Sequence, residues 1–427
     1  MKIIYGPPGT GKTTTLIDIV RQEVLRGVPI DKIAYVSFSK KAAVEAQQRL
    51  SSTLGFSVRQ APHFRTIHSL AFRAVRARAT QMMDVSKFVD FGKKSGFSLK
   101  GYYNPEEGLS SKDDDFIMLE QLYRNNRKYS ERALDLVDHT RFVTFMRLYS
   151  QYKRTFNYLD YTDLLDLYIE NNCEEDVRVA IIDEAQDLTT LQWNVVLRAF
   201  RNAERLYVAG DDDQCIYQWS GADVEVFLNL RGETTVLEHS HRLPSSIQKK
   251  AKEISSLIQK RVDKVYHGKE EKGKVRVIDT LEELTLSPKE SVYLLARNNF
   301  LLERYMQFCI DREIPFLLKG QSFVSEDDAA RVEAGNEDGM DELKVDYIKR
   351  VYRKDQPVNV NISTIHGVKG GEADHVVVLS DVSRGVTRQL NIDEDSEHRV
   401  FYVAVTRARN KLTIVAPESR TYYPYLV

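Results

Sequence analysis

The chain has 427 residues, enough for two to four domains, and its 61 Lys and Arg nearly balance its 62 Asp and Glu. With 29% charged and 42% hydrophobic residues, its composition excludes wholesale disorder and collagen-like repeats. No run approaches the roughly 18–20 apolar residues of a membrane-spanning helix, so we expect no membrane partner. The three cysteines lie far apart in the sequence, which favours a reducing, cytoplasmic setting over a disulfide or zinc framework.

The near-neutral total hides an uneven distribution of charge. Residues 1–100 carry 17 Lys and Arg against 6 Asp and Glu, and residues 46–83 contain no acid at all. This asymmetry is compatible with a polyanionic partner or with a solvated helix face. A second bias, nine acids between Ser325 and Asp346, predicts a solvated loop or short helix, because like charges hinder packing.

Short apolar runs alternate with helical patterns along most of the chain, which predicts an α/β fold with parallel sheets. The predicted strands are Lys2–Tyr5, Ile33–Phe38, Val177–Asp183, Leu206–Ala209, Val292–Leu295, Val358–Ser363, Val376–Leu379 and Leu412–Val415. They form two clusters, so we expect one α/β domain over residues 1–235 and another over 236–427. A mostly helical insertion is predicted at about 70–165 in the first domain, and a small acidic insertion at about 324–357 in the second.

The first chemical motif is a phosphate-binding loop. Strand-like Lys2–Tyr5 leads into a G-x-x-x-x-G-K-T sequence and then into a helical pattern. Its glycines let backbone N–H groups surround phosphates, while Lys12 reaches the β- and γ-phosphates and Thr13 binds Mg²⁺. The predicted nucleotide-binding residues of this stretch are Gly6, Pro7, Pro8, Gly9, Thr10, Gly11, Lys12, Thr13 and Thr14.

A second motif follows the apolar strand that ends at Asp183. A carboxylate at the carboxyl end of such a strand can hold Mg²⁺, and Glu184 beside it can activate a water for attack on the γ-phosphate. An acidic turn after a strand explains either residue alone, but not both residues together with a phosphate-binding loop.

These motifs and several later ones, in this order, resemble UvrD/Rep/PcrA-like superfamily 1 DNA helicases across nearly the whole chain. The matching stretches are 35–43, 66–70, 183–187, 208–222, 237–242, 364–372 and 402–409, which resemble motifs Ia, Ib, II, III, IV, V and VI. The resemblance implies two RecA-like domains that bind ATP and Mg²⁺ between them. It also implies a reduced second accessory domain, since only about forty residues lie between Phe323 and motif V.

The resemblance assigns further residues to ATP hydrolysis. It implies that Gln214 senses the γ-phosphate, that Arg242 and Arg407 act as arginine fingers, and that Glu372 contacts the ribose. His241 stands where relatives have a tyrosine that stacks on adenine, which leaves selectivity for adenine open.

The resemblance also assigns residues to DNA. Three aromatic residues, Phe38, Tyr217 and Trp219, match positions in the single-strand path, where bases stack. Four polar residues match phosphate contacts, namely Ser39, Lys40, Thr66 and His68, and His366 of motif V is assigned to DNA as well. A buried structural histidine remains the alternative for His68.

Together the motifs predict an ATP-dependent single-stranded DNA translocase and helicase, with 3′-to-5′ polarity implied by the resemblance. The expected partners are single-stranded and tailed duplex DNA, with replication or repair proteins, and we expect a monomer. One alternative is a translocase that displaces proteins without separating strands. Another is a DNA-binding regulatory module switched by ATP, which would not need the complete hydrolytic set.

Overall fold

The structure, a computed structural model, describes residues 1–57, 59–101, 113–126 and 138–427. The chain divides into two units. The first comprises Met1–Pro7 and Gly11–Leu237, and the second comprises Pro8–Thr10 and Glu238–Val427. Residues 102–112 and 127–137 of the predicted helical insertion lie outside the described residues.

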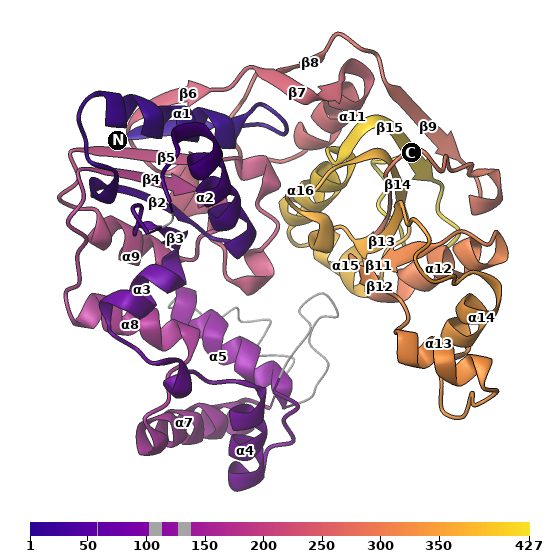
Figure 1. Ribbon diagram of the computed structural model, residues 1–427, viewed down its shortest axis with the longest axis horizontal. Helices are drawn as coiled ribbons and strands as arrows, with labels where there is room; N and C mark the ends of the chain where they lie inside the picture. Colours follow the sequence, from indigo (N-terminus) through magenta and orange to yellow (C-terminus); the bar gives the residue numbers. More distant parts are fainter. Residues whose placement is uncertain (58, 102–112, 127–137) are drawn as a thin grey trace. The chain divides into compact units, whose positions relative to one another are not determined.

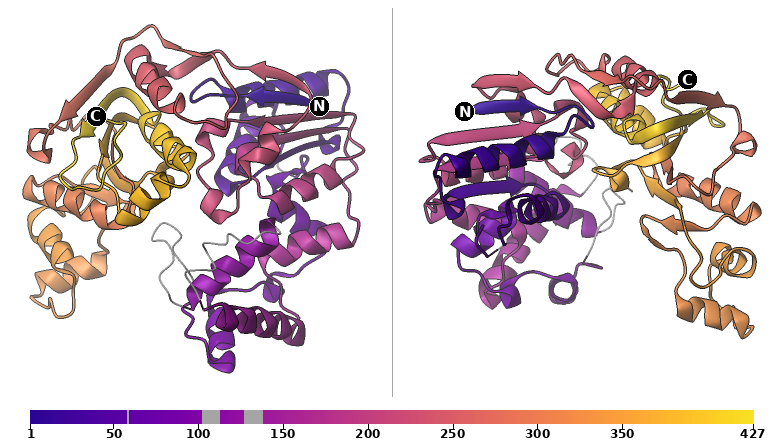
Figure 2. Two further views of the ribbon diagram at one scale, coloured as in Figure 1. Left: turned by 180° about the vertical axis from the view of Figure 1, so that it is seen from behind. Right: turned by 45° about the horizontal axis from the view of Figure 1, so that its top comes forward.

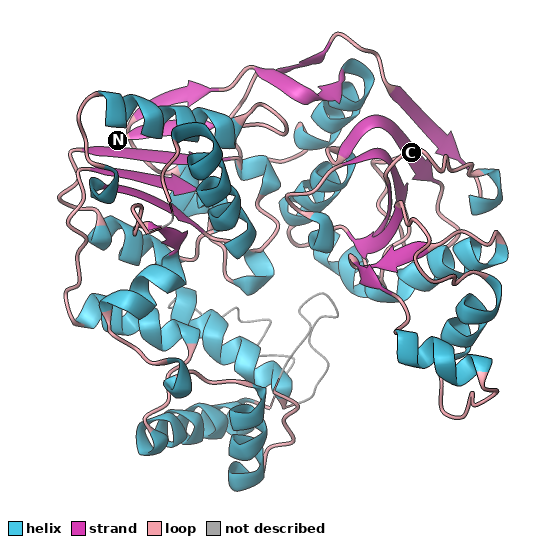
Figure 3. Ribbon diagram, viewed as in Figure 1, coloured by secondary structure: helices cyan, strands magenta, loops and turns pink. Residues whose placement is uncertain are grey.

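The first unit is built on a six-stranded parallel sheet with the strand order β3-β2-β4-β5-β1-β6 (Figures 1 and 3). The strands are β1 Lys2–Tyr5, β2 Ile33–Ser37, β3 Phe64–Thr66, β4 Val179–Asp183, β5 Arg205–Gly210 and β6 Glu233–Val236. Around the sheet lie α1 Lys12–Leu25, α2 Lys40–Leu54, α3 Ile67–Ala74, α9 Thr190–Ala199 and α10 Val224–Leu228. Strands β2 and β4 are buried over their whole length, which accounts for their nearly continuous apolar sequence.

The parallel arrangement places the predicted motifs at one edge of this sheet. Strand β1 leads into the glycine-rich loop, β2 into Phe38, β3 into α3, and β4 ends at Asp183. Carboxyl ends of neighbouring parallel strands lie at the same edge, where open α/β sheets bind their ligands.

The predicted helical insertion is present in the described residues and consists of α4 Val85–Ser95, α5 Asp114–Asn126, α7 His139–Phe156 and α8 Tyr161–Glu170 (Figure 2). Its core is unusually aromatic. Phe91, Phe145 and Tyr149 are almost completely buried and contact one another at ring-centroid distances of 5.4–5.7 Å. Edge-to-face and offset ring contacts of this kind stabilise beyond their buried area.

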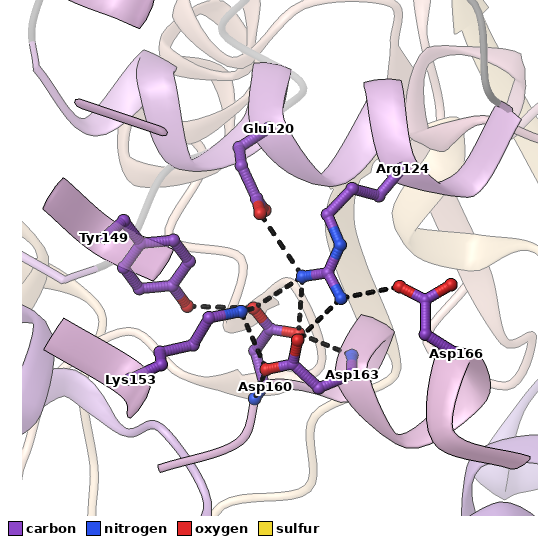
Figure 4. A network of polar contacts seen from close by, with 7 residues as sticks. All are labelled: Glu120, Arg124, Tyr149, Lys153, Asp160, Asp163 and Asp166. Carbon is purple, nitrogen blue, oxygen red and sulfur yellow. Dashed lines mark hydrogen bonds and ion pairs between the residues drawn. The ribbon is translucent and has the colours of Figure 1, made fainter. Parts of the chain in front are cut away.

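A buried polar network joins α5, α7 and α8 (Figure 4). Arg124 contacts four carboxylates, those of Glu120, Asp160, Asp163 and Asp166, at 2.6–3.2 Å. Lys153 contacts Asp160 at 2.5 Å and Asp163 at 2.7 Å. Four carboxylates therefore face two cations. Burial, together with the charge of Asp160, raises the pKa of Glu120 to about 7.

The second unit contains a seven-stranded sheet with the order β12-β11-β13-β10-β14-β15-β9. All its pairs are parallel except β11 with the short edge strand β12. The strands are β9 Lys274–Ile278, β10 Val292–Ala296, β11 Phe316–Leu318, β12 Gln321–Ser322, β13 Val360–Thr364, β14 Ala373–Leu379 and β15 Ala408–Val415. The pair β7 His239–Pro244 and β8 His267–Lys269 forms a separate small parallel sheet.

Helices complete the second unit: α11 Ser245–Ser255, α12 Leu302–Asp311, α13 Glu326–Glu333, α14 Glu342–Arg350, α15 Arg384–Leu390 and α16 Glu394–Val405. The predicted α/β class with two parallel-stranded sheets and a helical insertion in the first is confirmed. No helix within the described ranges has the length and apolar character needed to cross a bilayer.

Residues 325–346 form short helices, one of the two predicted alternatives, but the expectation that their acidic charges hinder packing is wrong. The segment contributes α13 and α14, and each helix buries one apolar face, which includes Val332 in α13 and Ile348 in α14. The acids fall at helix beginnings and on exposed faces. Ser325 and Asp341 cap the helices, and carboxylates in a first turn interact favourably with the helix dipole.

The raised pKa of Glu120 predicts a pH-dependent stability. A carboxyl group whose pKa is higher in the folded chain than its ordinary 4.5 keeps a proton that the unfolded chain has released. The contribution of Glu120 to the free energy of unfolding should therefore fall as the pH rises from about 4.5 to about 7, by roughly 1–3 kcal/mol. It is measured as the difference between wild type and Glu120→Gln, because His68 and the other histidines of lowered pKa contribute equally to both. In Glu120→Gln this decline should be absent, as measured by urea unfolding across that range. Glu170→Gln, a change of an exposed carboxylate on α8, is the matched control and should keep the wild-type slope; an equal slope in both variants would contradict the assignment.

Candidate active site

The loop between β1 and α1 adopts backbone conformations that require glycine. Gly9 and Gly11 have φ values of +74° and +78°, in the left-handed region that other residues rarely occupy. A Cβ on Gly6 would lie 2.9 Å from the Cβ of Lys12, and the N–H of Gly6 donates to the carbonyl of Gly210 at 2.9 Å.

Helix α1 begins at Lys12 with an N-terminus open to an anion. Its N-cap residue, Gly11, has no side-chain hydrogen bond, and the first turn, which includes Thr13 and Thr14, contains no acid. The first turn of α1 thus contains no carboxylate that could interact with its free N–H groups or with the positive end of the helix dipole. This arrangement suits a phosphate.

The Lys12 ammonium is held by the two acids of the second motif. Its Nζ lies 2.5 Å from Glu184 Oε1 and 3.1 Å from Asp183 Oδ1, and the lysine side chain is only 12% exposed. Burial opposes the charged form of Lys12, but the attraction of Asp183 and Glu184 outweighs it, and the pKa of Lys12 is raised. Lys12 therefore forms one centre with Asp183 and Glu184, which lie at least 171 residues further along the chain.

This centre suits a metal ion that arrives with a nucleotide. Mg²⁺ in proteins is typically held by one or two carboxylates together with waters and substrate phosphates. Asp183 supplies a carboxylate and Thr13 a hydroxyl next to Lys12. No group of three or more His, Cys, Asp or Glu suited to a metal occurs among the described residues, so nothing there resembles a metal centre made by protein ligands alone.

Tyr35, which the sequence analysis did not identify, positions Asp183. Its hydroxyl donates to Asp183 Oδ2 at 2.6 Å, and the tyrosine is completely buried on β2. Burial, together with the charge of Asp183, raises the pKa of Tyr35 well above its usual value, so the group remains a donor. The available signal was a single hydroxyl-bearing aromatic residue in an otherwise aliphatic strand.

Gln186, also missed, links the second motif to the third. Its amide nitrogen donates to Glu184 Oε2 at 2.6 Å, and its amide oxygen accepts from the N–H of Asp211 at 3.1 Å. Asp211 Oδ2 in turn accepts from Gln214 Nε2 at 2.8 Å. A Cβ on Gly210 would come within 2.4 Å of the Gln186 amide oxygen, so the strand must end in glycine here. We call Glu184, Gln186, Asp211 and Gln214 the hydrogen-bonded relay.

The three predicted DNA-stacking residues lie together. The rings of Phe38 and Tyr217 are stacked with centroids 5.5 Å apart, and Trp219 meets Tyr217 edge to face at 5.9 Å. All three side chains are partly exposed. Tyr217 is three residues beyond Gln214, so this aromatic cluster directly follows the relay in the chain.

The residues predicted to contact DNA phosphates in the first unit lie at the N-termini of two helices, α2 and α3. Ser39 accepts from the N–H of Ala42 at the start of α2, and Thr66 accepts from the N–H of Ser69 at the start of α3. Lys40 is exposed. His68 packs edge to face against Tyr161 at 5.5 Å, and burial lowers its pKa to about 4, so its imidazole is neutral at pH 7. His68 can therefore donate a hydrogen bond but brings no charge.

In the second unit, the predicted arginine finger Arg242 is ion-paired with the predicted ribose contact. Arg242 Nε lies 2.5 Å from Glu372 Oε2, and Arg409 approaches the other oxygen of that carboxylate at 3.5 Å. The sequence analysis placed Arg242 and Glu372 in separate roles and did not foresee their pairing.

The tip of the glycine-rich loop contacts β7. Ser240 Oγ donates to the carbonyl of Pro8 at 2.7 Å, and the N–H of His241 donates to the carbonyl of Gly9 at 2.8 Å. The ring of His241 is exposed. A Cβ on Gly9 would lie 2.3 Å from the Cβ of Arg242, so close approach as well as backbone conformation requires glycine.

Two motif residues of the second unit are buried. Arg407 is 1% exposed, and its guanidinium donates to the carbonyls of Val403 at 3.0 Å and Gly371 at 3.2 Å. His366 is 5% exposed, so a DNA contact by its ring requires a different conformation of its loop.

The relay predicts a specific defect for Gln186→Met. The variant preserves side-chain volume but removes the bonds to Glu184 and Asp211, so DNA-stimulated ATP hydrolysis should fall by about 10-fold or more, the usual scale for a residue that orients a functional group. Phosphate release in the presence of single-stranded DNA measures the effect.

Gln192→Met is the matched control. Gln192 is equally buried, but its amide oxygen caps α9 by accepting from the N–H of Thr189 at 3.0 Å. Both variants should lose comparable stability, about 1–3 kcal/mol, because each leaves a buried N–H without its acceptor. Equal hydrolysis rates in the two variants would show that Gln186 serves stability only.

Comparison with known proteins supports this interpretation of the motifs. The UvrD/REP helicase N-terminal domain model matches residues 2–235, and the UvrD-like helicase C-terminal domain model matches residues 340–419. The ATP-dependent DNA helicase Rep of Buchnera aphidicola is 24% identical over 363 residues, covering 76% of this chain and 53% of that protein. A probable DNA helicase of Mycoplasma pneumoniae is 23% identical over 470 residues, covering the whole of this chain and 82% of the relative.

Other similarities are more partial. The ATP-dependent DNA helicase Rep of Escherichia coli is 28% identical over 247 residues, covering 52% of this chain and 35% of that protein. An arterivirus nonstructural protein 10 helicase structure aligns with a TM-score of 0.40 at 13% identity, covering 98% of this chain and 60% of that one. The matched region thus spans about half the length of the Buchnera protein and about a third of the E. coli protein. With the N-terminal domain model matching more than half of its residues, the chain belongs to the UvrD/REP helicase family.

Proposed function

We propose that this protein is an ATP-dependent DNA helicase that moves along single-stranded DNA in the 3′-to-5′ direction. The observation that carries the proposal is the connection inside the first unit. A lysine–carboxylate centre suited to a nucleoside triphosphate is joined through the hydrogen-bonded relay to a partly exposed aromatic cluster. A chemical event at Glu184 therefore has a short physical route to rings that can stack on bases.

The nucleotide roles combine the geometry of the first unit with the roles that the family resemblance assigns to Gln214 and to the residues of the second unit. Lys12 and the N–H groups of the glycine-rich loop bind the phosphates, and Thr13 and Asp183 hold the Mg²⁺, which neutralises phosphate charge when bound. Glu184 accepts a proton from the attacking water, and Gln214 contacts the γ-phosphate. The second unit contributes Arg242 and Arg407 for transition-state charge, and Glu372 and His241 for the ribose and base.

Binding of a triphosphate must break an existing interaction. Lys12 is paired with Asp183 and Glu184, and Arg242 is paired with Glu372. The phosphates replace these carboxylates as partners of the cations. Glu184 is thereby released from the ammonium and becomes able to act as a base.

The DNA roles divide into stacking and charge. Phe38, Tyr217 and Trp219 stack on bases, at about 1–3 kcal/mol for each base by alanine substitution, without selecting sequence. Ser39, Lys40, Thr66 and His68 contact phosphates, and His366 of the second unit completes the set. The neutral state of His68 makes Lys40 the cationic member of these phosphate contacts in the first unit.

An unwinding assay with 3′-tailed and 5′-tailed duplexes tests the proposal. Wild-type protein with ATP and Mg²⁺ should separate the 3′-tailed duplex much faster than the 5′-tailed one, because translocation begins on the single strand. Equal rates, or unwinding of the 5′-tailed substrate alone, would contradict the polarity. Displacement of streptavidin from a biotinylated single strand, without any unwinding, would instead support a translocase that clears proteins from DNA.

A further inference from the structure

The exposed face of α7 in the helical insertion carries cations that none of the motifs uses. Arg147 and Arg154 are exposed and lie seven residues apart, which places them on the same face, about 10 Å apart along the helix axis. Gln151 is exposed between them.

Three neighbouring hollows lie beside α7 and the residues that follow it. The first, of 460 Å³, is lined by Arg147, Ser150, Gln151, Arg154 and Thr155. The second, of 380 Å³, shares Ser150 and Arg154 with the first and continues to Asn157 and Tyr158. The third, of 550 Å³, shares Asn157 and Tyr158 with the second and continues past Phe156 to Arg76 and Arg78. Their shared lining residues place the three hollows next to one another, and we call them together the basic groove.

The charge of the groove is concentrated at its two ends. No ion pair among the described residues involves Arg76, Arg78, Arg147 or Arg154. By contrast, the neighbouring Arg141 pairs with Asp113 at 2.8 Å. The middle hollow is lined by Arg124 and Lys153, whose charges are met by the carboxylates of Figure 4, and by three acids, Asp163, Asp166 and Glu170. A polyanion would therefore be held at the two arginine pairs and pass over the middle.

An aromatic platform accompanies the arginines. Phe156 is 44% exposed, and its ring stacks on that of Tyr158 with centroids 5.8 Å apart and planes 20° apart. Lys94 lies over the Phe156 ring at 5.2 Å, and Lys87 over the Tyr158 ring at 5.0 Å. Both lysines are ion-paired, with Asp90 and Asp84 respectively, so the unpaired charge near the rings comes from the arginines. Exposed aromatic rings among cations are the combination that sequence-independent single-strand sites use. A polyanionic protein segment would need the arginines but not the rings.

The groove connects to the predicted DNA contacts through α3. That helix is capped by Thr66 and carries His68, and it ends at Ala74, two residues before Arg76. Arg76 has a φ of +54°, and the N–H of the following Ala77 donates to the carbonyl of Phe72, a reversal that ends the helix and directs the chain toward α7. The eight residues of α3 span about 12 Å.

We propose that the basic groove binds a second stretch of the single-stranded DNA held by Phe38, Tyr217 and Trp219. Arg76, Arg78, Arg147 and Arg154 contact its phosphates, and Phe156 and Tyr158 stack on its bases or sugars. This inference rests on the proposed function, since it supposes that single-stranded DNA is the ligand. It also accounts for part of the acid-free, arginine-rich sequence between residues 46 and 83.

The test compares the salt dependence of DNA binding in paired charge variants. Arg147→Gln/Arg154→Gln and Arg76→Gln/Arg78→Gln should each lower the slope of log affinity against log salt by about 1.4, because each phosphate that is no longer neutralised lowers it by about 0.7. Lys249→Gln/Lys252→Gln, which removes two exposed charges from α11, is the control and should keep the wild-type slope. Fluorescence anisotropy of a labelled oligothymidine measures all four proteins, and hydrolysis at saturating DNA should be unchanged.

Photocrosslinking separates failure of the groove from failure of the proposed function. An oligonucleotide containing 5-iododeoxyuridine should form adducts at Phe156 or Tyr158 as well as at Phe38, Tyr217 or Trp219. Adducts at the latter three alone, with unchanged slopes in both arginine variants, would overturn the groove and leave the proposed function standing. No DNA binding by wild-type protein would overturn both. A polyglutamate peptide of equal charge that displaces the DNA with equal affinity would overturn the proposal and identify the groove as a site for acidic protein segments.

Discussion

The buried ion pair between Lys12 and the Asp183–Glu184 carboxylates is the interaction on which the first unit depends. An ammonium that is only 12% exposed cannot remain charged without close anions, and here two are supplied from the end of β4. The positions of β1, β4 and the glycine-rich loop follow from bringing these three side chains together at one edge of the sheet. The surrounding polar groups, including Tyr35, fix the carboxylates in turn.

The pairing of Lys12 with two carboxylates also explains how the site can respond to a bound anion. Any anion that competes for Lys12 frees Glu184, and Glu184 is bonded to Gln186 and, through it, to Asp211 and Gln214. The middle of the relay, Gln186 and Asp211, is buried, and a Cβ on Gly210 would lie only 2.4 Å from the Gln186 amide oxygen. Packed elements of this kind shift as units, so a change at the carboxylates can reach the aromatic cluster three residues beyond Gln214.

Much of this arrangement could be predicted from sequence because it is encoded locally. The glycine-rich loop, the apolar strand before Asp183 and the alternation of strands with helices each have a pattern within a short window, and the structure has these elements where they were expected. Tyr35, Gln186 and the Arg242–Glu372 pair were missed, because hydrogen bonds and ion pairs between distant elements leave no periodic trace. The acidic segment was misjudged because its overall charge was considered without its helix caps and apolar stripe.

The excess of basic residues in the N-terminal region is another feature that the sequence alone could not interpret. Sequence alone left two interpretations of the arginines, a polyanion partner or a solvated face. In the structure the arginines have different surroundings. Arg49 pairs with Glu45, whereas Arg76 and Arg78 line a hollow together with the carboxyl end of α7. Whether an arginine is available to bind a polyanion depends on which residues the fold brings next to it.

The most direct test of the account is ATP binding and hydrolysis by Glu184→Gln in the presence of single-stranded DNA. Removing this carboxylate takes away the base and also one of the two anions that compete with phosphate for Lys12. The account predicts that the variant binds ATP at least as tightly as the wild type but releases phosphate slower by about 100-fold or more, the usual contribution of a general base. Near-normal turnover by the variant, or loss of ATP binding, would contradict it.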